Sequence, residues 1–319
     1  MRGEPLMPDA FSTVLTEKVP ELLDLADLEV KIVFNLDSSD VGPEHWELLA
    51  REINTCRDEF DGFVIIHGTD TMAFTASALS FALLDLGKPV VLTGAQRPLA
   101  AVRTDGRRNL VDAVDLATRP INDVGICFDG LFLRGSRTTK SNSNDYRGFE
   151  SPGIEPLAKL GVEIVFSESC RPLPTREAYR FRPSFEPAVL AIHVVPGFGT
   201  SLFEELITGA RRDLRGLVLA AYGSGTVPRR GPDLTRMVAK AVDAGIEVLV
   251  VTQSAGQVDL NRYENSRELQ RVGAISGGEM SLEAGVTKMM HALAQFDDSR
   301  ARRTYLLSNV VGERKSSLP

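Results

Sequence analysis

Residues 62–72 read Gly-Phe-Val-Ile-Ile-His-Gly-Thr-Asp-Thr-Met, and the architecture of the chain can be worked out from this segment. Phe63–Ile66 is a short apolar run between two glycines, which is typical of a strand buried on both faces in a parallel sheet. Small and apolar residues then recur at helical spacing, namely Ala73, Ala76, Leu79 and Leu83. The polar residues Thr69–Thr71 therefore lie where a strand ends and a helix begins, and open α/β sheets bind ligands at such positions.

A simpler interpretation of Thr69–Thr71 is an ordinary capped turn. In that case Thr69 or Asp70 is the N-cap residue, and its side-chain oxygen accepts a hydrogen bond from a backbone N–H of the first helical turn. The same free N–H groups and the helix dipole would favour a bound anion in a functional site. The spacing alone slightly favours the capped turn.

Strands and helices are expected to alternate along most of the remaining chain. The expected strands are residues 29–36, 89–93, 188–195, 216–222 and 247–253, and the expected helices are residues 43–57, 105–117, 202–210, 234–244 and 281–296. Val124–Phe128 and Leu131–Arg134 flank Asp129-Gly130, which predicts a β-hairpin. The alternation predicts an α/β fold with two domains. The larger has a flavodoxin-like, mostly parallel sheet with helices on both faces, and a smaller α/β domain follows.

Prolines mark the expected boundary between the two domains. Four of them fall among charged residues between Cys170 and Pro187, a composition that is typical of a linker. We therefore expect an N-terminal domain over residues 1–170, a linker over residues 171–187 and a C-terminal domain over residues 188–319.

Composition and charge exclude several classes of protein. With 43% apolar and 25% charged residues, the chain has the composition of a soluble globular protein. The formal net charge of -7 argues against binding to nucleic acid. No run approaches the roughly 18 apolar residues that span a membrane, and residues 1–10 lack the core of a signal peptide. Three scattered cysteines without metal-ligand spacing indicate reduced thiols and a cytoplasmic location.

Two glycine-rich segments do not complete a nucleotide-binding motif. Residues 196–200 and 222–226 each follow an expected strand, but neither contains the third glycine of G-x-G-x-x-G, and the chain has no Walker A sequence. We interpret both segments as tight turns. The four histidines have no metal-ligand spacing, and His67 and His193, which lie within apolar strands, are expected to be core residues.

Polar clusters follow several of the expected strands and should meet at one edge of a parallel sheet. They are residues 37–40, 69–71 and 94–96, with a further cluster at 134–142 after the hairpin. A carboxylate can orient a lysine amine that takes a proton from a hydroxyl or from water, so Thr69, Asp70 and Lys140 would form a proton-handling set. The alternative for Lys140 is a solvated surface lysine, which is the usual situation of this residue type.

Seven segments match one known family in chain order. They are NLDSSD (35–40), GFVIIHGTDTMAFTASALSF (62–81), GKPVVLTGAQRPL (87–99), LRGSRTTKSNS (133–143), AYGSGT (221–226), VTQSAGQVDLNRYENS (251–266) and ISGGEMSLEAGVTKM (275–289). These segments resemble the bacterial-type L-asparaginases, most closely the cytoplasmic type I group. The resemblance covers nearly the whole chain, and it implies hydrolysis of L-asparagine to L-aspartate and ammonia.

The resemblance also implies which residues act. The catalytic residues would be Thr69, Asp70 and Lys140. The substrate-binding residues would be Asp37, Ser38, Ser39, Thr69, Asp70 and Ala95. Ser38 and Ser39 would hold the α-carboxylate and the amine of the substrate, and the backbone of Ala95 would line its amide end. No metal and no organic cofactor is implied, and the family is usually a homodimer or a homotetramer.

The chain departs from the family at its amino end. The first strand of the family leads into a TGGT segment whose threonine is the nucleophile, and the 319 residues contain no such segment. We expect Met1 to be an internal methionine taken as the start, with a shortened protein as the alternative. Loss of a covalent nucleophile lowers the rate by roughly 10⁴ to 10⁶, so the activity of the chain as given is expected to be impaired.

Two other functions stay open on the sequence alone. The first is a non-catalytic amino-acid-binding protein that keeps the pocket without the nucleophile. The second is the function of the D subunit of the archaeal glutamyl-tRNA amidotransferase. That subunit shares this core, but it normally carries an additional amino-terminal domain and works with a partner subunit. The acidic charge of the chain counts against the second function.

Overall fold

The protein divides into two compact units. The computed structural model describes residues 15, 17–171, 178–198, 200–209, 213–228 and 234–315. Unit 1 is Met1–Ser151 with Glu155–Pro183, and unit 2 is Pro152–Ile154 with Ser184–Pro319. Both units combine helices with a sheet, so the expected α/β class is confirmed.

The boundaries expected from the sequence, residues 1–170, 171–187 and 188–319, stay a prediction. Residues 172–177 of the expected linker lie outside the described residues, as do residues 1–14 with the expected polar start of the chain. Within the expected linker, β10 (Arg180–Phe181) pairs with β2 (Leu83–Leu84), both of them in unit 1. This part of the chain is therefore not purely a connector.

The other elements of unit 1 alternate as expected up to residue 128, whereas the strands beyond residue 134 were not expected from the sequence. These other elements are η1 (Pro20–Asp24), η2 (Ser38–Asp40), α2 (Pro43–Cys56), β1 (Phe63–Ile66), α3 (Met72–Ala82), β3 (Val90–Thr93), α4 (Gly106–Ala117), β4 (Val124–Phe128), β5 (Leu131–Arg134), η3 (Gly135–Arg137), β6 (Thr139–Lys140), β7 (Phe149–Glu150), β8 (Ala158–Leu160) and β9 (Ile164–Phe166). α2 shows the physical basis of these helices. Pro43 occupies its first turn, and Trp46, Leu49 and Ile53 are buried along one side.

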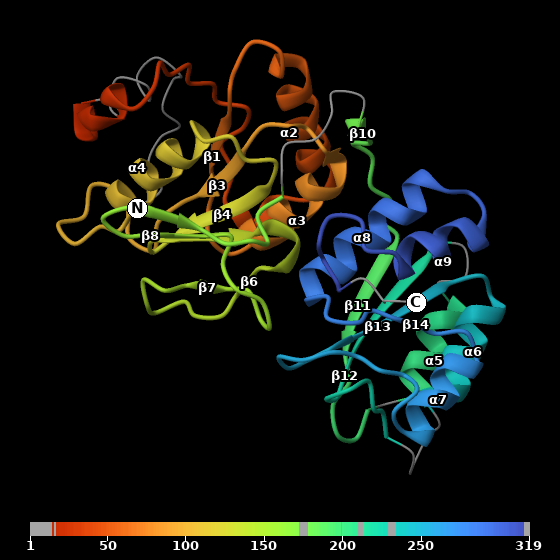
Figure 1. The fold of residues 1–319 in the computed structure, drawn as a ribbon. Coiled ribbons are helices and arrows are strands. Elements are labelled where there is room, and N and C mark those ends of the chain that lie inside the picture. The colour runs from red at the N-terminus through yellow and green to blue at the C-terminus, as the bar shows by residue number, and fades with distance from the viewer. Residues whose placement is uncertain are drawn as a thin grey trace. The chain divides into compact units, whose positions relative to one another are not determined.

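The main sheet of unit 1 has the strand order β1-β3-β4-β5-β8-β9. β1, β3 and β4 are parallel, and β5, β8 and β9 extend the sheet in antiparallel pairs. α4 covers one face of the parallel part and α3 the other, with α2 packed on α3 (Figure 1). β3 is therefore buried along its whole length. The expected sheet with helices on both faces is therefore confirmed for its parallel strands, β1, β3 and β4.

The hairpin expected at residues 124–134 is confirmed. β4 and β5 pair in antiparallel register, with Phe128 opposite Leu131. The two turn residues have positive φ angles, 48° at Asp129 and 71° at Gly130. Two consecutive left-handed residues are the requirement of a type I′ turn, and Asp-Gly meets it at little steric cost.

Two expectations about the edge of this sheet are wrong. Residues 29–36 form no strand, although exposed Glu29 and Lys31 alternate with partly buried Val30 and Ile32. β1 is only partly buried, and the side chain of Ile66 is 48% exposed. Among the described residues, β1 pairs with β3 alone, so it lies at the edge of the sheet instead of between two strands. A strand requires a ladder partner, and residues 29–36 have none among the described residues.

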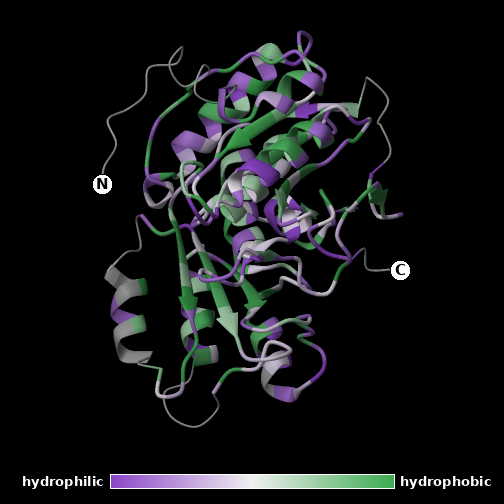
Figure 2. Cartoon of the chain, turned by 90° about the vertical axis from the view of Figure 1, so that its left-hand side faces the viewer, coloured by the Kyte–Doolittle hydropathy of each residue, from purple (hydrophilic) through white to green (hydrophobic). Residues whose placement is uncertain are grey.

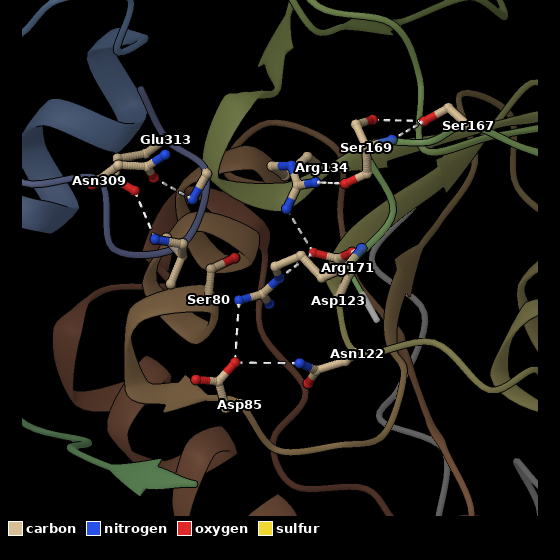
Figure 3. A network of polar contacts seen from close by, with 12 residues as sticks. Ser80, Asp85, Asn122, Asp123, Arg134, Ser167, Ser169, Arg171, Asn309 and Glu313 are labelled. Carbon is tan, nitrogen blue, oxygen red and sulfur yellow. Dashed lines mark hydrogen bonds and ion pairs between the residues drawn. The ribbon is translucent and has the colours of Figure 1, made fainter. Parts of the chain in front are cut away.

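A network of charged side chains ties the amino end of β4 to the end of β5 (Figure 3). The buried carboxylate of Asp123 accepts hydrogen bonds from Arg134 Nη1 at 2.7 Å and from Arg171 Nε at 2.8 Å. Asp85 lies 3.7 Å from the Arg171 guanidinium and accepts a bond of 3.3 Å from Asn122 Nδ2. The two arginines therefore share one buried counter-charge.

Unit 2 is built on a four-stranded, fully parallel sheet with the order β11-β12-β13-β14. Its elements are β11 (Val189–His193), α5 (Thr200–Gly209), β12 (Gly216–Ala221), α6 (Leu234–Asp243), β13 (Glu247–Thr252), α7 (Glu264–Arg271), β14 (Ile275–Ser276), α8 (Leu282–Gln295) and α9 (Ser299–Leu307). α8 packs on one face of the sheet and α6 on the other (Figure 1). The expected strands and helices of this region are confirmed within a few residues, whereas α7 and α9 were not expected.

Apolar residues concentrate in the strands of both units, as the colouring by hydropathy shows (Figure 2). β12 is buried at every position, and nearly the whole of β13 is buried as well. Across the described ranges, no helix is both long and apolar enough to cross a membrane.

Candidate functional site

The site begins at the turn between β1 and α3, where Gly68 lets a second turn approach. A Cβ atom on Gly68 would lie 2.7 Å from Ser38 Oγ, so only glycine allows the observed contact. Thr71 Oγ1 donates a hydrogen bond of 2.5 Å to the carbonyl oxygen of Ser38. Thr71 is also the N-cap residue of α3, and its side chain makes no capping hydrogen bond. The interpretation of Thr69 or Asp70 as the N-cap is therefore wrong.

The side chain of Lys140 reaches the Thr69–Asp70 turn. Its Nζ atom donates hydrogen bonds of 2.8 Å to Thr69 Oγ1 and 2.7 Å to Asp70 Oδ1. The side chain of Lys140 is only 16% exposed, while that of Asp70 is 68% exposed. The alternative of a solvated surface lysine is wrong, and the three residues expected to handle protons lie together.

Close packing against α3 places the segment that carries Lys140. This segment follows Arg134 and turns through η3, where a Cβ atom on Gly135 would lie 2.8 Å from the backbone oxygen of Ala76. Lys140 then pairs with Phe149 in the β6–β7 ladder. The backbone is thus fixed on both sides of η3 before the lysine side chain extends to Asp70.

The Asp37–Asp40 turn supplies hydroxyl and carboxylate groups next to Gly68. Asp37 Oδ1 accepts hydrogen bonds from the backbone N–H of Ser39 at 2.9 Å and from Ser39 Oγ at 2.8 Å. The bond from the backbone N–H of Ser39 is the main reason why the pKa of Asp37 is lowered. Ser38 is buried, whereas Asp37 and Ser39 are exposed. The ionised Asp37 therefore shapes the turn and leaves oxygen atoms available to a ligand.

The turn after β3 brings Gly94–Gln96 to the same place. A Cβ atom on Gly94 would lie 2.3 Å from the carbonyl oxygen of His67, which shows how closely this turn approaches the β1 loop. Thr69 Oγ1 donates to Gln96 Oε1 at 3.5 Å. Ala95, expected to line the site through its backbone, lies between these two contacts. All the residues expected from the sequence thus lie in three neighbouring turns and on β6.

Sequence reasoning missed two residues that hold the Gly94–Gln96 turn. The carboxylate of Asp105 accepts hydrogen bonds from the backbone N–H groups of Gln96 at 2.9 Å and Arg97 at 3.0 Å. Asn109 Nδ2 donates to the carbonyl oxygen of Gly94 at 2.9 Å. The helical spacing of Asp105 and Asn109, one turn apart at the start of α4, was visible in the sequence but gave no indication of a common target.

His67 is a core residue, as expected, and His193 is not. The imidazole of His67 lies between the carbonyl oxygen of Gly68 at 2.6 Å and Thr75 Oγ1 at 3.0 Å, so both ring nitrogens have partners. Burial lowers the pKa of His67, which keeps the ring neutral. His193 is exposed at the end of β11. Through the part of the chain that the structure describes, no three His, Cys, Asp or Glu residues cluster as metal ligands would.

The arrangement brings a hydroxyl, an ammonium and a carboxylate into one chain of hydrogen bonds. An ammonium that donates to both oxygens stabilises negative charge on the hydroxyl oxygen, and the amine form of the same lysine accepts a proton from it. Such a set can activate a hydroxyl or a water molecule without a metal.

Comparisons with known proteins identify the family. Residues 3–171 match the family model described as "Asparaginase, N-terminal", and residues 188–306 match "Glutaminase/Asparaginase C-terminal domain". L-asparaginase 1 of Escherichia coli K12 is 38% identical over 281 residues, which cover 87% of this chain and 82% of that protein. The L-asparaginase of Thermococcus kodakarensis is 34% identical over 91% of this chain and 87% of that protein.

A solved structure shows the same fold over nearly the whole length. The thermostable L-asparaginase of Thermococcus kodakarensis superimposes with a TM-score of 0.87 at 32% identity, covering 94% of this chain and 92% of that one. The two family-model matches fall in the two units, and the first of them contains the three turns and Lys140. The chain belongs to the asparaginase family, in the type I group of L-asparaginase 1.

Proposed function

We propose that this protein hydrolyses the side-chain amide of L-asparagine to give L-aspartate and ammonia. The amide C–N bond breaks, water supplies the new carboxylate oxygen, and its protons pass to the leaving nitrogen. The observation that carries this proposal is the position of Lys140 Nζ, 2.8 Å from Thr69 Oγ1 and 2.7 Å from Asp70 Oδ1. Family membership and the names of the relatives give the substrate class.

In this proposal Thr69, Asp70 and Lys140 are the catalytic residues. Lys140 exchanges a proton with the Thr69 hydroxyl, and Asp70 orients the lysine and compensates its charge. The exposed carboxylate of Asp70 would also pair with the α-amine of the substrate. The proposal requires no metal and no organic cofactor, because side chains and backbone N–H groups can supply nucleophile activation, charge stabilisation and proton transfer.

The substrate would lie over the three turns. Ser38 and Ser39, with Asp37 behind them, would hold the α-carboxylate and the amine, since Asp37 already orients Ser39. The backbone of Ala95 would line the amide end, next to Gln96 and its contact with Thr69.

Replacement of Lys140 tests the proposal. We expect Lys140→Met to lower the rate of ammonia release from asparagine by about 10³-fold to 10⁴-fold, because loss of one member of a catalytic set removes most of its effect. Lys31→Met is the matched control, since Lys31 forms an ion pair with Glu52 on the surface of the same unit. In a form that releases ammonia, a Lys140→Met rate within tenfold of the unchanged protein contradicts the assignment.

The assay is run on two forms of the protein. One is the 319-residue chain, and the other extends it upstream in its reading frame, because the family places its acyl-forming threonine in a TGGT segment that the 319 residues do not contain. Calorimetry with L-aspartate measures binding in both forms. If both forms bind L-aspartate and neither releases ammonia, the result contradicts hydrolysis and supports the amino-acid-binding function.

Location and assembly also belong to the proposal. Three free cysteines are consistent with a reducing, cytoplasmic environment. A homodimer or homotetramer follows from family resemblance, and light scattering during size-exclusion chromatography measures it. A molar mass equal to the 34.8 kDa of one chain would contradict that expectation.

A further inference from the structure

The side chain of Gln96 joins three segments of unit 1. Its Nε2 atom donates to the carbonyl oxygen of Asn142 at 3.1 Å and to that of Asp145 at 2.9 Å. Its Oε1 atom accepts from Thr69 Oγ1 at 3.5 Å. Both amide hydrogens therefore point to the loop after Lys140, and the amide oxygen faces the hydroxyl that Lys140 contacts.

The backbone of Gln96 is fixed independently of these contacts. Asp105, the N-cap residue of α4, accepts from its N–H at 2.9 Å and also binds the Nδ2 group of Asn109. Gln96 thus extends from a turn held by α4. The loop it contacts, residues 141–148, is exposed along residues 141–145, and near its end Arg147 Nε donates to Asp129 Oδ2 at 3.4 Å.

The loop closes on itself and packs against the Gln96 amide. The N–H groups of Ser141 and Asn142 both donate to the carbonyl oxygen of Gly148, at 2.9 and 3.2 Å. A Cβ atom on Gly148 would lie 2.6 Å from Gln96 Nε2, so the amide lies directly against the glycine backbone. Tyr146, whose hydroxyl donates to the carbonyl oxygen of Arg103 at 2.5 Å, adds a second attachment near the end of the loop.

We infer that Gln96 is a positioning residue, which holds the 141–148 loop and with it Lys140 at the distance from Thr69 that the reaction requires. It also orients the Thr69 hydroxyl. While Lys140 is an ammonium that donates to Thr69 Oγ1, the hydroxyl proton points to the acceptor that Gln96 presents, its Oε1 atom, and it can turn to Nζ only when the lysine is an amine. The catalytic part of this inference rests on the proposed function, but the restraint of the loop does not.

Hydrogen exchange tests the restraint without any turnover. Gln96→Met keeps the length of the side chain and removes both amide hydrogens. We expect the amides of residues 141–148 to exchange at least about tenfold faster than in the unchanged protein, because lost contacts lower the free energy of local opening. Gln295→Met is the control, since Gln295 Nε2 also donates to a backbone carbonyl, that of Ser184, in unit 2. Unchanged exchange of the loop in Gln96→Met overturns the inference.

Kinetics with two Gln96 variants test the effect on catalysis. We expect Gln96→Met and Gln96→Glu to lower kcat about 10-fold to 100-fold at neutral pH, with KM changed less than about threefold, because the reacting groups are displaced. An ionised glutamate has no hydrogen to donate, but its protonated form regains one donor and one acceptor. The activity of Gln96→Glu relative to the unchanged enzyme should therefore rise as the pH falls toward about 4.3, while that of Gln96→Met stays constant.

The two experiments separate the possible failures. Unchanged kcat in both variants, or no relative gain for Gln96→Glu in acid, contradicts the positioning of catalytic groups even where the loop exchanges faster. Absence of ammonia release from the unchanged, upstream-extended protein contradicts the proposed function, and the exchange rates then decide the role of Gln96 by themselves.

Discussion

At the scale of single residues, Gly68 determines where Ser38 can lie. The two residues belong to different turns, and the contact exists because position 68 has no side chain. Added atoms in a closely packed site displace their neighbours and typically cost about 1–3 kcal/mol. The neighbour here is Ser38, which is expected to bind the substrate. The displacement should therefore weaken substrate binding as well as lower stability.

We therefore expect Gly68→Ala to lower the free energy of unfolding by about 1–3 kcal/mol and to weaken binding of L-aspartate. The added Cβ would lie 2.7 Å from Ser38 Oγ and 2.8 Å from Ser38 Cβ. Gly161→Ala is the control, because a Cβ there meets only a backbone oxygen at 3.8 Å. Urea unfolding and calorimetry measure both effects, and equal behaviour of the two variants would refute the steric argument.

At the scale of elements, the β4–β5 hairpin carries the site segment. Its turn is fixed by Asp129 and Gly130, and its other end is fixed by the network around Asp123 (Figure 3). Thr138 Oγ1 donates to the carbonyl oxygen of Arg134 at 2.7 Å, which fixes the chain shortly before Lys140. The hairpin therefore links a buried charge cluster to the position of the proposed catalytic lysine.

Asp123→Asn should lower the free energy of unfolding by about 3–5 kcal/mol, since it leaves two partly or fully buried guanidinium groups without their shared negative charge. Asp115→Asn offers the contrast. Asp115, on the last turn of α4, pairs at the surface with Arg119 just beyond the helix, and a pair at this spacing contributes about 0.3–0.5 kcal/mol. Guanidinium unfolding of both variants compares them, and a loss below about 1 kcal/mol in Asp123→Asn would show that the network is not a stabilising anchor.

At the scale of the whole molecule, a buried ion pair influences stability although its residues lie far along the chain from those of the site. In unit 2 the ammonium of Lys288 on α8 is fully buried and pairs with Glu313. It also donates to the carbonyl oxygens of Leu306 and Ser308. Burial outweighs the attraction of Glu313 and lowers the pKa of Lys288 to about 8. The pair thus joins the last described residues to the helix that covers the unit 2 sheet.

This pair gives stability a defined pH dependence. Because the pKa of Lys288 is lower in the folded protein than the ordinary 10.5, the unfolded chain binds more protons between these values. The contribution to stability is therefore complete above about pH 10.5 and is lost as the pH falls through about 8. Lys288→Met should remove this dependence and cost about 3–5 kcal/mol at pH 7, since the buried Glu313 loses its counter-charge and keeps only neutral donors such as the backbone N–H groups of Val310 and Val311. Denaturation between pH 7 and 10 measures the cost of the substitution and the pH dependence of stability. If stability changes with pH in the variant as it does in the unchanged protein, Lys288 is not the source of the dependence.

Much of the architecture could be predicted because it is encoded locally. The apolar run Phe63–Ile66, the Asp129-Gly130 turn and the spacing of α2 each specify their own conformation. Residues 29–36 were predicted wrongly because a strand depends on a partner elsewhere in the chain. The same limit hid the contacts of Gln96, which lie 27 to 49 residues away, although its cluster was expected at this edge of the sheet. The convergence of Thr69, Asp70 and Lys140 was predictable, since parallel strands deliver their ends to one edge and the family resemblance added the lysine.

The unequal burial of Asp70 and Lys140 has a consequence for the solution conditions of any assay. The carboxylate is mostly in solvent and the ammonium is mostly not, so small dissolved cations can reach one member of the pair without displacing the other. Ammonium ion, which the proposed reaction releases, is such a competitor. Progress curves should therefore slow more in ammonium chloride than in tetramethylammonium chloride of equal ionic strength, because only the former can donate hydrogen bonds to Asp70.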